Sequence, residues 1–187
     1  QNRTEDDWLD VLEELLISAF RYRMVSDVPV GIFLSGGIDS SLLAAVLQKH
    51  VSNIHSFTIG FQEYGFDESQ FARKVAQHLK IQHTEKVLKL DEARSLFHDF
   101  YSIYDEPFAD NSTVPTVLVS KLARKQVKVA LSADGGDEIF GGYNKFNLAE
   151  KFTRSIPIGL QTILSGSMSL INPSHIPYFN NKYNFTT

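Results

Sequence analysis

The stretch from Val30 to Leu47 constrains the fold most, because it predicts a strand, a glycine turn and a helix in direct succession. The apolar run VGIFL is typical of a strand that is buried on both faces. SGGIDSS follows it, and then LLAAVL, which is apolar almost all round and predicts a buried helix. These three pieces form the opening half of a βαβ unit.

The same alternation continues along the chain. Further strands are predicted at 55–61, 83–88 and 127–132, and further helices at 67–79, 91–104 and 114–124. The expected apolar helix faces are Phe71, Val75 and Leu79 in the first of these helices, and Leu96, Phe97, Phe100 and Tyr104 in the second. An amphipathic helix from Trp8 to Arg23 precedes them, with Asp6 and Asp7 in the place of its cap and first-turn acids.

Strands that alternate with helices predict a parallel sheet covered on both faces, that is, a Rossmann-like three-layer αβα fold. Ligands of such sheets bind beyond the carboxyl ends of the strands, where the strand order reverses. We predict three segments: an N-terminal helix packing on the core at 1–26, the core at 27–150, and the start of a truncated helical part at 151–187. Three of the six prolines lie in that last segment, where hydrophobic periodicity is weak.

Composition excludes several classes of function. The chain has 187 residues, a net charge of −4 and no cysteine. Phosphate backbones select for basic surfaces, so nucleic acid is not expected as a partner. No apolar run is long enough to span a bilayer, so no membrane is expected either. The lack of cysteine rules out disulfides and thiolate sites in this chain, and we expect a cytoplasmic protein.

The loop SGGIDSS has the composition of an anion-binding turn. Its glycines let the backbone approach an anion closely, and the next helix adds the positive end of its dipole. It matches neither the Walker A sequence nor G-x-G-x-x-G, so a tight turn with a serine cap remains an alternative. Asp39 favours a ligand, because a carboxylate beside a polyphosphate needs Mg²⁺ between them. Its alternative role is to cap the helix.

A second loop, LSADGGDEIFGGY, follows the last predicted strand. It carries three acids, Asp134, Asp137 and Glu138, around two glycines. In a parallel sheet both loops lie at the same edge, so Asp39 and Asp137 could share one magnesium ion, with Glu138 as outer support. The alternative is an acidic surface turn.

Three ordered blocks resemble a known family. SGGIDSS resembles the pyrophosphate loop of ATP pyrophosphatases with the adenine-nucleotide α-hydrolase-like (PP-loop) fold. HSFTIGFQEYGFDESQFARKVAQHLKIQHTE, YDEPFADNSTVPTVLVSKLAR and VKVALSADGGDEIFGGY resemble the synthetase domain of glutamine-dependent asparagine synthetases. The likeness covers roughly residues 27–143 and is specific, because the blocks occur in order.

The resemblance implies a reaction and a set of site residues. ATP would adenylylate a carboxylate and release pyrophosphate, and ammonia would then give the amide and AMP. The implied magnesium ligands are Asp39 and Asp137, and the implied catalytic acids are these two and Asp134. The implied ATP contacts are Phe33, Ser35, Gly36, Gly37, Asp39, Ser40, Ile59, Gly60, Ser132 and Ala133.

Two departures from the family's pattern leave alternatives open. Asp134 stands where asparagine synthetases usually have Glu, which leaves the acceptor open between aspartate and another carboxylate, such as a sugar acid in polysaccharide synthesis. This chain contains neither the family's glutaminase domain nor its cysteine. The expected source of ammonia is therefore a glutaminase domain that is not part of this chain. The chain then reads as a fragment that is inactive alone, or as a non-catalytic ATP-binding module. Self-association into a homo-oligomer is also open.

Overall fold

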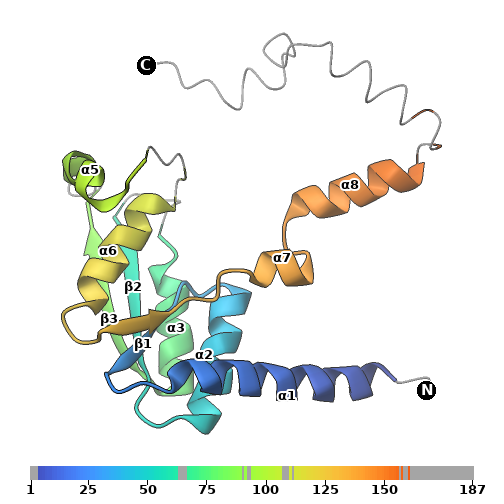
Figure 1. Ribbon diagram of the computed structural model, residues 1–187, viewed down its shortest axis with the longest axis horizontal. Helices are drawn as coiled ribbons and strands as arrows, with labels where there is room; N and C mark the ends of the chain where they lie inside the picture. Colours follow the sequence, from blue (N-terminus) through green and yellow to red (C-terminus); the bar gives the residue numbers. More distant parts are fainter. Residues whose placement is uncertain are drawn as a thin grey trace. The chain divides into compact units, whose positions relative to one another are not determined.

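The computed structural model describes residues 4–62, 67–89, 91, 94–106, 110, 112–155, 157 and 160. The chain divides into two compact units, Gln1–Asp134 and Gly135–Thr187. The first unit contains the sheet, and the second contains the helices α7 (Gly136–Phe140) and α8 (Asn144–Ser155) (Figure 1). The predicted segment limits of 1–26, 27–150 and 151–187 stay a prediction.

Within the described residues, the first unit is built on a four-stranded parallel sheet. Its strands are β1 (Val30–Phe33), β2 (His55–Phe61), β3 (Gln82–Leu88) and β4 (Val129–Leu131), in the order β3-β2-β1-β4. In the register, Phe33 of β1 lies opposite Phe57 of β2, and Ile32 lies opposite Leu131 of β4. The parallel sheet confirms the predicted α/β fold class.

Helices cover both faces of the sheet, which gives three layers. α2 (Ile38–His50) and α3 (Ser69–Leu79) pack against one face, and α6 (Thr113–Ala123) packs against the other (Figure 1). Successive strand residues point to opposite faces. Ile32 and its register partner Ser56 therefore share the face under α2 and α3, and Phe57, the next residue, joins the cluster under α6.

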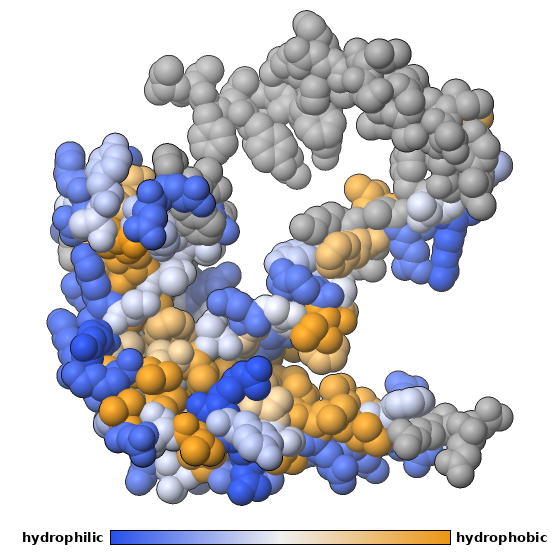
Figure 2. All heavy atoms as spheres, in the orientation of Figure 1, coloured by the Kyte–Doolittle hydropathy of each residue, from blue (hydrophilic) through white to orange (hydrophobic). Residues whose placement is uncertain are grey.

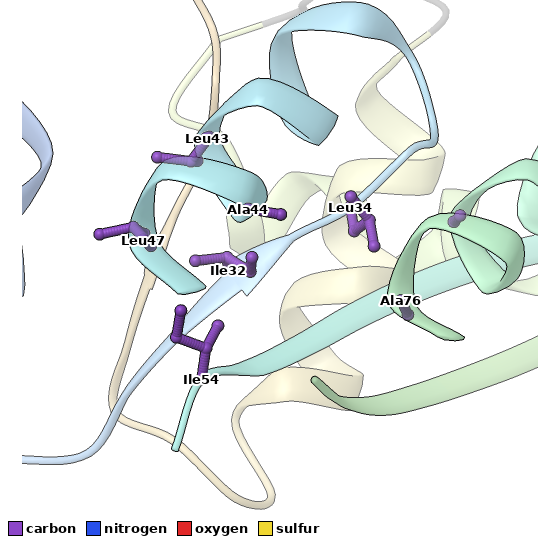
Figure 3. Packing of buried hydrophobic residues seen from close by; sticks show 8 residues of the cluster. Ile32, Leu34, Leu43, Ala44, Leu47, Ile54 and Ala76 are labelled. Atoms are coloured by element: carbon purple, nitrogen blue, oxygen red, sulfur yellow. The ribbon is translucent and has the colours of Figure 1, made fainter. Parts of the chain in front are cut away.

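A cluster of buried aliphatic side chains holds α2 and α3 on the sheet (Figure 3). Its members are Ile32, Leu34, Leu43, Ala44, Leu47, Ile54, Ala72 and Ala76. Burying one Leu or Ile side chain stabilises a fold by about 1.5–3 kcal/mol. Because β1 and α2 both contribute to the cluster, it fixes the two ends of the glycine turn that joins them.

The N-terminal helix α1 (Glu5–Met24) begins in a capping box. Thr4 N donates to Asp7 Oδ2 at 2.8 Å, and Asp7 N donates to Thr4 Oγ1 at 3.2 Å. The helix itself is confirmed, but its cap is Thr4, and Asp7 is the third residue of the helix. The reason is that the threonine hydroxyl and the acid three residues later satisfy two exposed N–H groups reciprocally.

The C-terminal end of α1 packs on the core. Phe20 and Met24 pack against the buried aliphatic cluster. All 20 of its described residues keep some exposure. Hydrophobic side chains gather along the helix surface (Figure 2), among them the exposed Trp8, Leu9 and Leu15.

Two of the predicted helices differ in detail from the observed ones. The segment 91–104 is not one α-helix: a 3₁₀ helix, η1 (Ser95–Asp99), runs into a short α5 (Phe100–Ile103). Residues three apart share a face in a 3₁₀ helix as well as in an α-helix, so the spacing of the apolar residues does not distinguish these two kinds of helix. Leu96 is buried as predicted, whereas Phe97 is exposed. In α3, Phe71 is half exposed, and the buried apolar positions are Ala72 and Ala76.

The second unit contains two helices that we did not predict. α7 begins after Gly135, whose φ of 95° is left-handed, and ends before Gly141, whose φ is 68°. α8 follows at Asn144. Most of the predicted tail, 151–187, lies outside the described residues. In the part of the chain that the structure describes, no helix has the length and apolar character needed to cross a membrane.

Candidate functional site

The strand order places a topological switch point between β1 and β4. From β1 the chain moves to β2 and β3 on one side of the sheet, and it returns to β4 on the other side. Loops that leave two such strands diverge and open a crevice at their carboxyl ends. The loop after β1 carries SGGIDSS, and the loop after β4 carries Ser132, Ala133 and Asp134. Both predicted site loops of the first unit therefore leave the strands that flank the switch point.

Hydrogen bonds within the SGGIDSS loop close it on itself. Ser35 N donates to Ser40 Oγ at 3.2 Å, and the two serine hydroxyl oxygens lie 2.9 Å apart. Gly37 N donates to Ser35 Oγ at 3.2 Å. Ser40 is buried and Ser35 is exposed, so the pair links the helix interior to the loop surface. These hydrogen bonds hold the loop in its observed conformation.

The turn at Gly36 requires glycine for two reasons. Its φ is 83°, in the left-handed region that side chains other than glycine rarely adopt. A Cβ atom there would lie 2.5 Å from Ala72 N and 2.6 Å from Phe71 Cβ. The loop therefore rests directly on the beginning of α3. The role of Phe71 and Ala72 was not predicted, because the sequence shows no sign of this long-range contact.

The N-terminus of α2 has the features of an anion site. Gly37 is the N-cap and supplies no side-chain hydrogen bond, so the first N–H groups of this helix are not capped by a side chain. Asp39 lies in the first turn and is half-buried, while Ile38 beside it is 87% exposed. A carboxylate at this point is favourable to the helix dipole and also available to a cation.

Phe33, Ile59 and Gly60 lie at the ends of two neighbouring strands. Phe33 and Ile59 pack, partly buried, against the cluster under α6 that contains Phe57. Their side chains could therefore line an apolar surface on that face. Gly60 is buried, and a Cβ atom there would lie 2.6 Å from Ser69 Oγ and 2.7 Å from Asp67 Oδ1.

The residues after β4 differ in burial. Ala133 packs, partly buried, against the aliphatic cluster, whereas Ser132 and Asp134 are exposed. Asp134 is thus a free-standing carboxylate at the switch point, in contrast to the half-buried Asp39. No group of three or more His, Asp or Glu side chains suited to a metal occurs among the described residues. A magnesium site here would depend on phosphate oxygens for its remaining ligands.

In the second unit, Asp137 and Glu138 form local contacts around a glycine turn. Gly142 N donates to the main-chain oxygen of Asp137 at 3.0 Å, and the Asp137 carboxylate lies against Gly142. Tyr143 Oη donates to Glu138 Oε1 at 2.7 Å. Asp39 and Asp137 belong to different units. The sharing of one magnesium ion by these two acids therefore stays a prediction.

A polar layer, formed by side chains of β2 and β3 and by Arg73 of α3, lies on the same face of the sheet as the buried aliphatic cluster. His83 Nδ1 lies 2.9 Å from Ser56 Oγ, and His83 Nε2 lies 3.9 Å from Glu85 Oε2. Arg73 binds Glu85 through Nε and Nη2 at 2.9 and 2.5 Å. These hydrogen bonds from Arg73 lower the pKa of Glu85. Burial lowers the pKa of His83, more than the nearby Glu85 raises it, with small lowering effects from Arg73 and His55.

We expect this layer to make the first unit less stable in mild acid. Burial makes the pKa of His83 lower in the folded chain than the ordinary value of a histidine, so the unfolded chain binds its proton more readily. The free energy of unfolding should therefore be unaffected by His83 above about pH 7 and should fall as the pH drops below about 6.5. Urea titrations at pH 7.5 and 5.5 would measure this fall.

The matched variant is His83→Asn, because an amide can still pair with Ser56 but does not titrate. It should show a smaller loss of stability between pH 7.5 and 5.5 than the wild type. His55, whose pKa is also lowered by burial, should retain its own contribution. An unchanged pH dependence in His83→Asn would show that the loss arises elsewhere.

These features define the first unit as a three-layer α/β domain with a glycine turn at its switch point. The family model described as asparagine synthase matches residues 11–183. Because this match covers most of the chain, the protein belongs to the asparagine synthase family. The resemblance of the sequence blocks is thereby confirmed.

Curated relatives agree with this assignment. The putative asparagine synthetase (glutamine-hydrolyzing) 2 of Methanocaldococcus jannaschii is 43% identical over 157 residues, which cover 81% of this chain and 30% of the relative. Asparagine synthetase (glutamine-hydrolyzing) 1 of Bacillus subtilis is 38% identical over 162 residues, covering 86% and 26%. The chain thus spans less than a third of the length of these relatives.

A solved structure supports the fold. Glutamine-dependent NAD+ synthetase from Acinetobacter baumannii, in complex with adenosine diphosphate, is similar with a TM-score of 0.51 and 22% sequence identity. The likeness covers 70% of this chain and 26% of that one. At this identity the comparison establishes a shared arrangement of strands and helices, and it agrees with the predicted PP-loop fold.

Proposed function

We propose that this chain is the nucleotide-binding core of an enzyme that forms an amide from a carboxylate, ATP and ammonia. The carboxylate would be adenylylated with release of pyrophosphate, and ammonia would then displace AMP. The observation that carries the proposal is the α2 N-terminus without a side-chain cap, which follows a glycine turn at the switch point and holds Asp39 in its first turn. The family membership supports the same chemistry.

The residues present could perform this work by positioning and electrostatics. Main-chain N–H groups in the first turn of α2 would bind phosphate oxygens, because the N-cap Gly37 supplies no side-chain partner for them. Phe33 and Ile59 would hold the adenosine, and Ser132 and Ala133 would close the pocket. A bound magnesium ion would neutralise charge on the leaving pyrophosphate. Asp39 is suited to hold it, and Asp137 is its proposed second ligand.

The first test is the binding of Mg–ATP to an Asp39→Ala variant. Loss of a carboxylate ligand should weaken binding by about tenfold or more, since 1.4 kcal/mol corresponds to a factor of ten. Calorimetry on the 187-residue chain with and without Mg²⁺ would measure it. Asp91→Ala, which removes an exposed acid that pairs with Arg94, is the matched control and should bind like the wild type.

A measurement in EDTA separates a metal ligand from a structural acid. Without Mg²⁺, the carboxylate of Asp39 repels the phosphates, so Asp39→Ala should bind ATP as tightly as the wild type or more tightly. Equal affinity of the two proteins for Mg–ATP would contradict the proposed role of Asp39. Equal weakening with and without Mg²⁺ would point to a damaged loop.

The acceptor we favour is the β-carboxylate of aspartate, with asparagine as the product. The relatives are named as glutamine-hydrolyzing asparagine synthetases, which supports ammonia supplied by a glutaminase. Asp134 favours a second candidate, an amidotransferase for another carboxylate such as a sugar acid. Its carboxylate is one methylene shorter than the usual glutamate and exposed. Pyrophosphate release by the full-length protein, measured with aspartate and with uronic acids, separates the two.

A cytoplasmic location and a homo-oligomeric state remain proposals. The first is based on the absence of cysteine, and the second on the exposed apolar side chains of α1.

A further inference from the structure

Two glycines of the candidate site pack on the same helix turn, although they belong to different strand ends. Gly36 follows β1, and the position of its missing Cβ lies 2.5 Å from Ala72 N. Gly60 lies near the end of β2, and the position of its missing Cβ lies 2.6 Å from Ser69 Oγ. Both contacts fall within four residues of α3. The beginning of α3 therefore supports both backbone turns at once.

The position of this helix turn is fixed by a side chain that precedes it. Asp67 Oδ1 accepts a hydrogen bond from Ser69 N at 3.1 Å. The N-cap residue, Glu68, makes no side-chain cap hydrogen bond, and Asp67 supplies one from the preceding position instead. The same Asp67 oxygen lies 2.7 Å from the position of a Cβ on Gly60. Asp67 thus touches the helix start and the strand end together.

The surroundings hold this arrangement without room for adjustment. Ser69 and Ala72 are both fully buried, and Gly60 is buried as well. Close-packed interiors transmit a displacement, because there are no voids to absorb it. If the first turn of α3 shifts, the contacts with Gly36 and Gly60 must shift with it.

We propose that Asp67 is a positioning residue that holds the first turn of α3 and, through it, the glycine turns at Gly36 and Gly60. This inference rests on the proposed function, since these turns are the expected contacts of the triphosphate and of the ribose and adenine. Asp67 touches neither of these groups. It acts by keeping the two turns in a fixed position relative to each other, so that phosphates and nucleoside are bound by one rigid surface.

Replacing Asp67 by asparagine distinguishes a role of its hydrogen bond from a role of its negative charge. Asp67 also lies near Arg73, whose own hydrogen bonds go to Glu85. Asp67→Asn removes the charge but keeps Oδ1 as an acceptor for Ser69 N. Asp67→Ala removes both. The proposal requires that Asn restores what Ala loses.

The first measurement uses the chain without ligand. In two-dimensional NMR spectra of the 187-residue protein, Asp67→Ala should shift the main-chain amide signals of Gly36 and Gly60 together. It should also speed the exchange of the Gly60 amide by about tenfold, as expected for a locally loosened segment. Asp67→Asn should leave both amides close to the wild type.

The matched control is Asp7→Ala, which removes a carboxylate that accepts a main-chain N–H at the start of a different helix, α1. It loses a comparable cap and lowers stability in a comparable way, but it should leave Gly36 and Gly60 unchanged. Shifts of the two glycines in Asp7→Ala would mean that they report general loosening, which would overturn the proposal. Unchanged glycines in Asp67→Ala, or a failure of Asn to restore them, would also overturn it.

The second measurement is the dissociation constant for Mg–ATP. We expect it to rise about tenfold in Asp67→Ala and to return to within about twofold of the wild type in Asp67→Asn. Equal affinity of Asp67→Ala and the wild type would overturn the positioning role. If the wild type itself does not bind Mg–ATP, the proposed function fails, and the NMR comparison still decides whether Asp67 positions the two turns.

Discussion

Replacing Gly36 by alanine should lower the free energy of unfolding by about 2–4 kcal/mol, because it combines a strained backbone with overpacking. The φ of 83° is unfavourable for any residue with a Cβ atom. In addition, that atom would lie 2.5 Å from Ala72 N and 2.7 Å from the Phe71 carbonyl carbon, which are backbone atoms that cannot rotate away. Urea denaturation of the two proteins would measure the loss.

Gly37→Ala is the control, since it places the same methyl group one residue further on. The φ of Gly37 is −68°, and the closest contact of a Cβ there is the movable Ser35 Oγ at 3.3 Å. We expect this variant to change stability by less than about 1 kcal/mol, because the cost of losing a glycine N-cap is offset by reduced freedom in the unfolded chain. Equal losses in both variants would refute the contact between the loop and α3.

The parallel sheet and the location of the loops could largely be predicted from the sequence, whereas the strand order could not. The apolar run 30–34 is followed by a glycine turn, and each of the runs 30–34 and 55–61 is followed by a helical pattern, which is a local signal. Parallel pairing and right-handed crossovers then place SGGIDSS at the carboxyl edge. The structure confirms this position for the loop after β1 and for Ser132–Asp134 after β4.

The face of α3 was predicted in part: Val75 and Leu79 pack, partly buried, against the aliphatic cluster. Its fully buried positions could not be predicted, because hydrophobic periodicity weighs large side chains above small ones. Phe71 carries the stronger signal, but it is half exposed, and Ala72 is buried instead. Alanine lets the helix backbone approach the sheet and the glycine turn closely, which a phenylalanine at that position would prevent. Successive helix residues are rotated by about 100°, so Ala72 and Ala76 lie on the side of the helix next to the predicted Val75 and Leu79.

The support of the site by α3 was missed for a related reason. Asp67 was assigned only to the start of a helix, and Gly60 only to a nucleotide contact. Their proximity depends on the register of β2 and on the angle at which α3 returns, and neither is encoded within a short stretch. The sequence could not predict either that the second loop leads into a separate unit, which contains α7 and α8.

Replacing Phe57 by alanine should have the largest effect on stability, a loss of about 3–5 kcal/mol in the free energy of unfolding. The ring is fully buried among Val119 and Ala123 of α6 and stacks on His55 at a centroid distance of 4.3 Å. It also fills the space beside Gly31, where a Cβ would lie 2.6 Å from Phe57 Cε2. Thermal and urea unfolding would measure the loss.

A double-mutant cycle tests whether Phe57 and Gly31 are fitted to each other. Gly31→Ala alone should destabilise, because the added methyl group meets the ring, but in the Phe57→Ala background it should cost less. Phe71→Ala is the matched control: its ring is half exposed, so its removal should cost less than about 1 kcal/mol. Additive losses at Gly31 and Phe57 would contradict the fit.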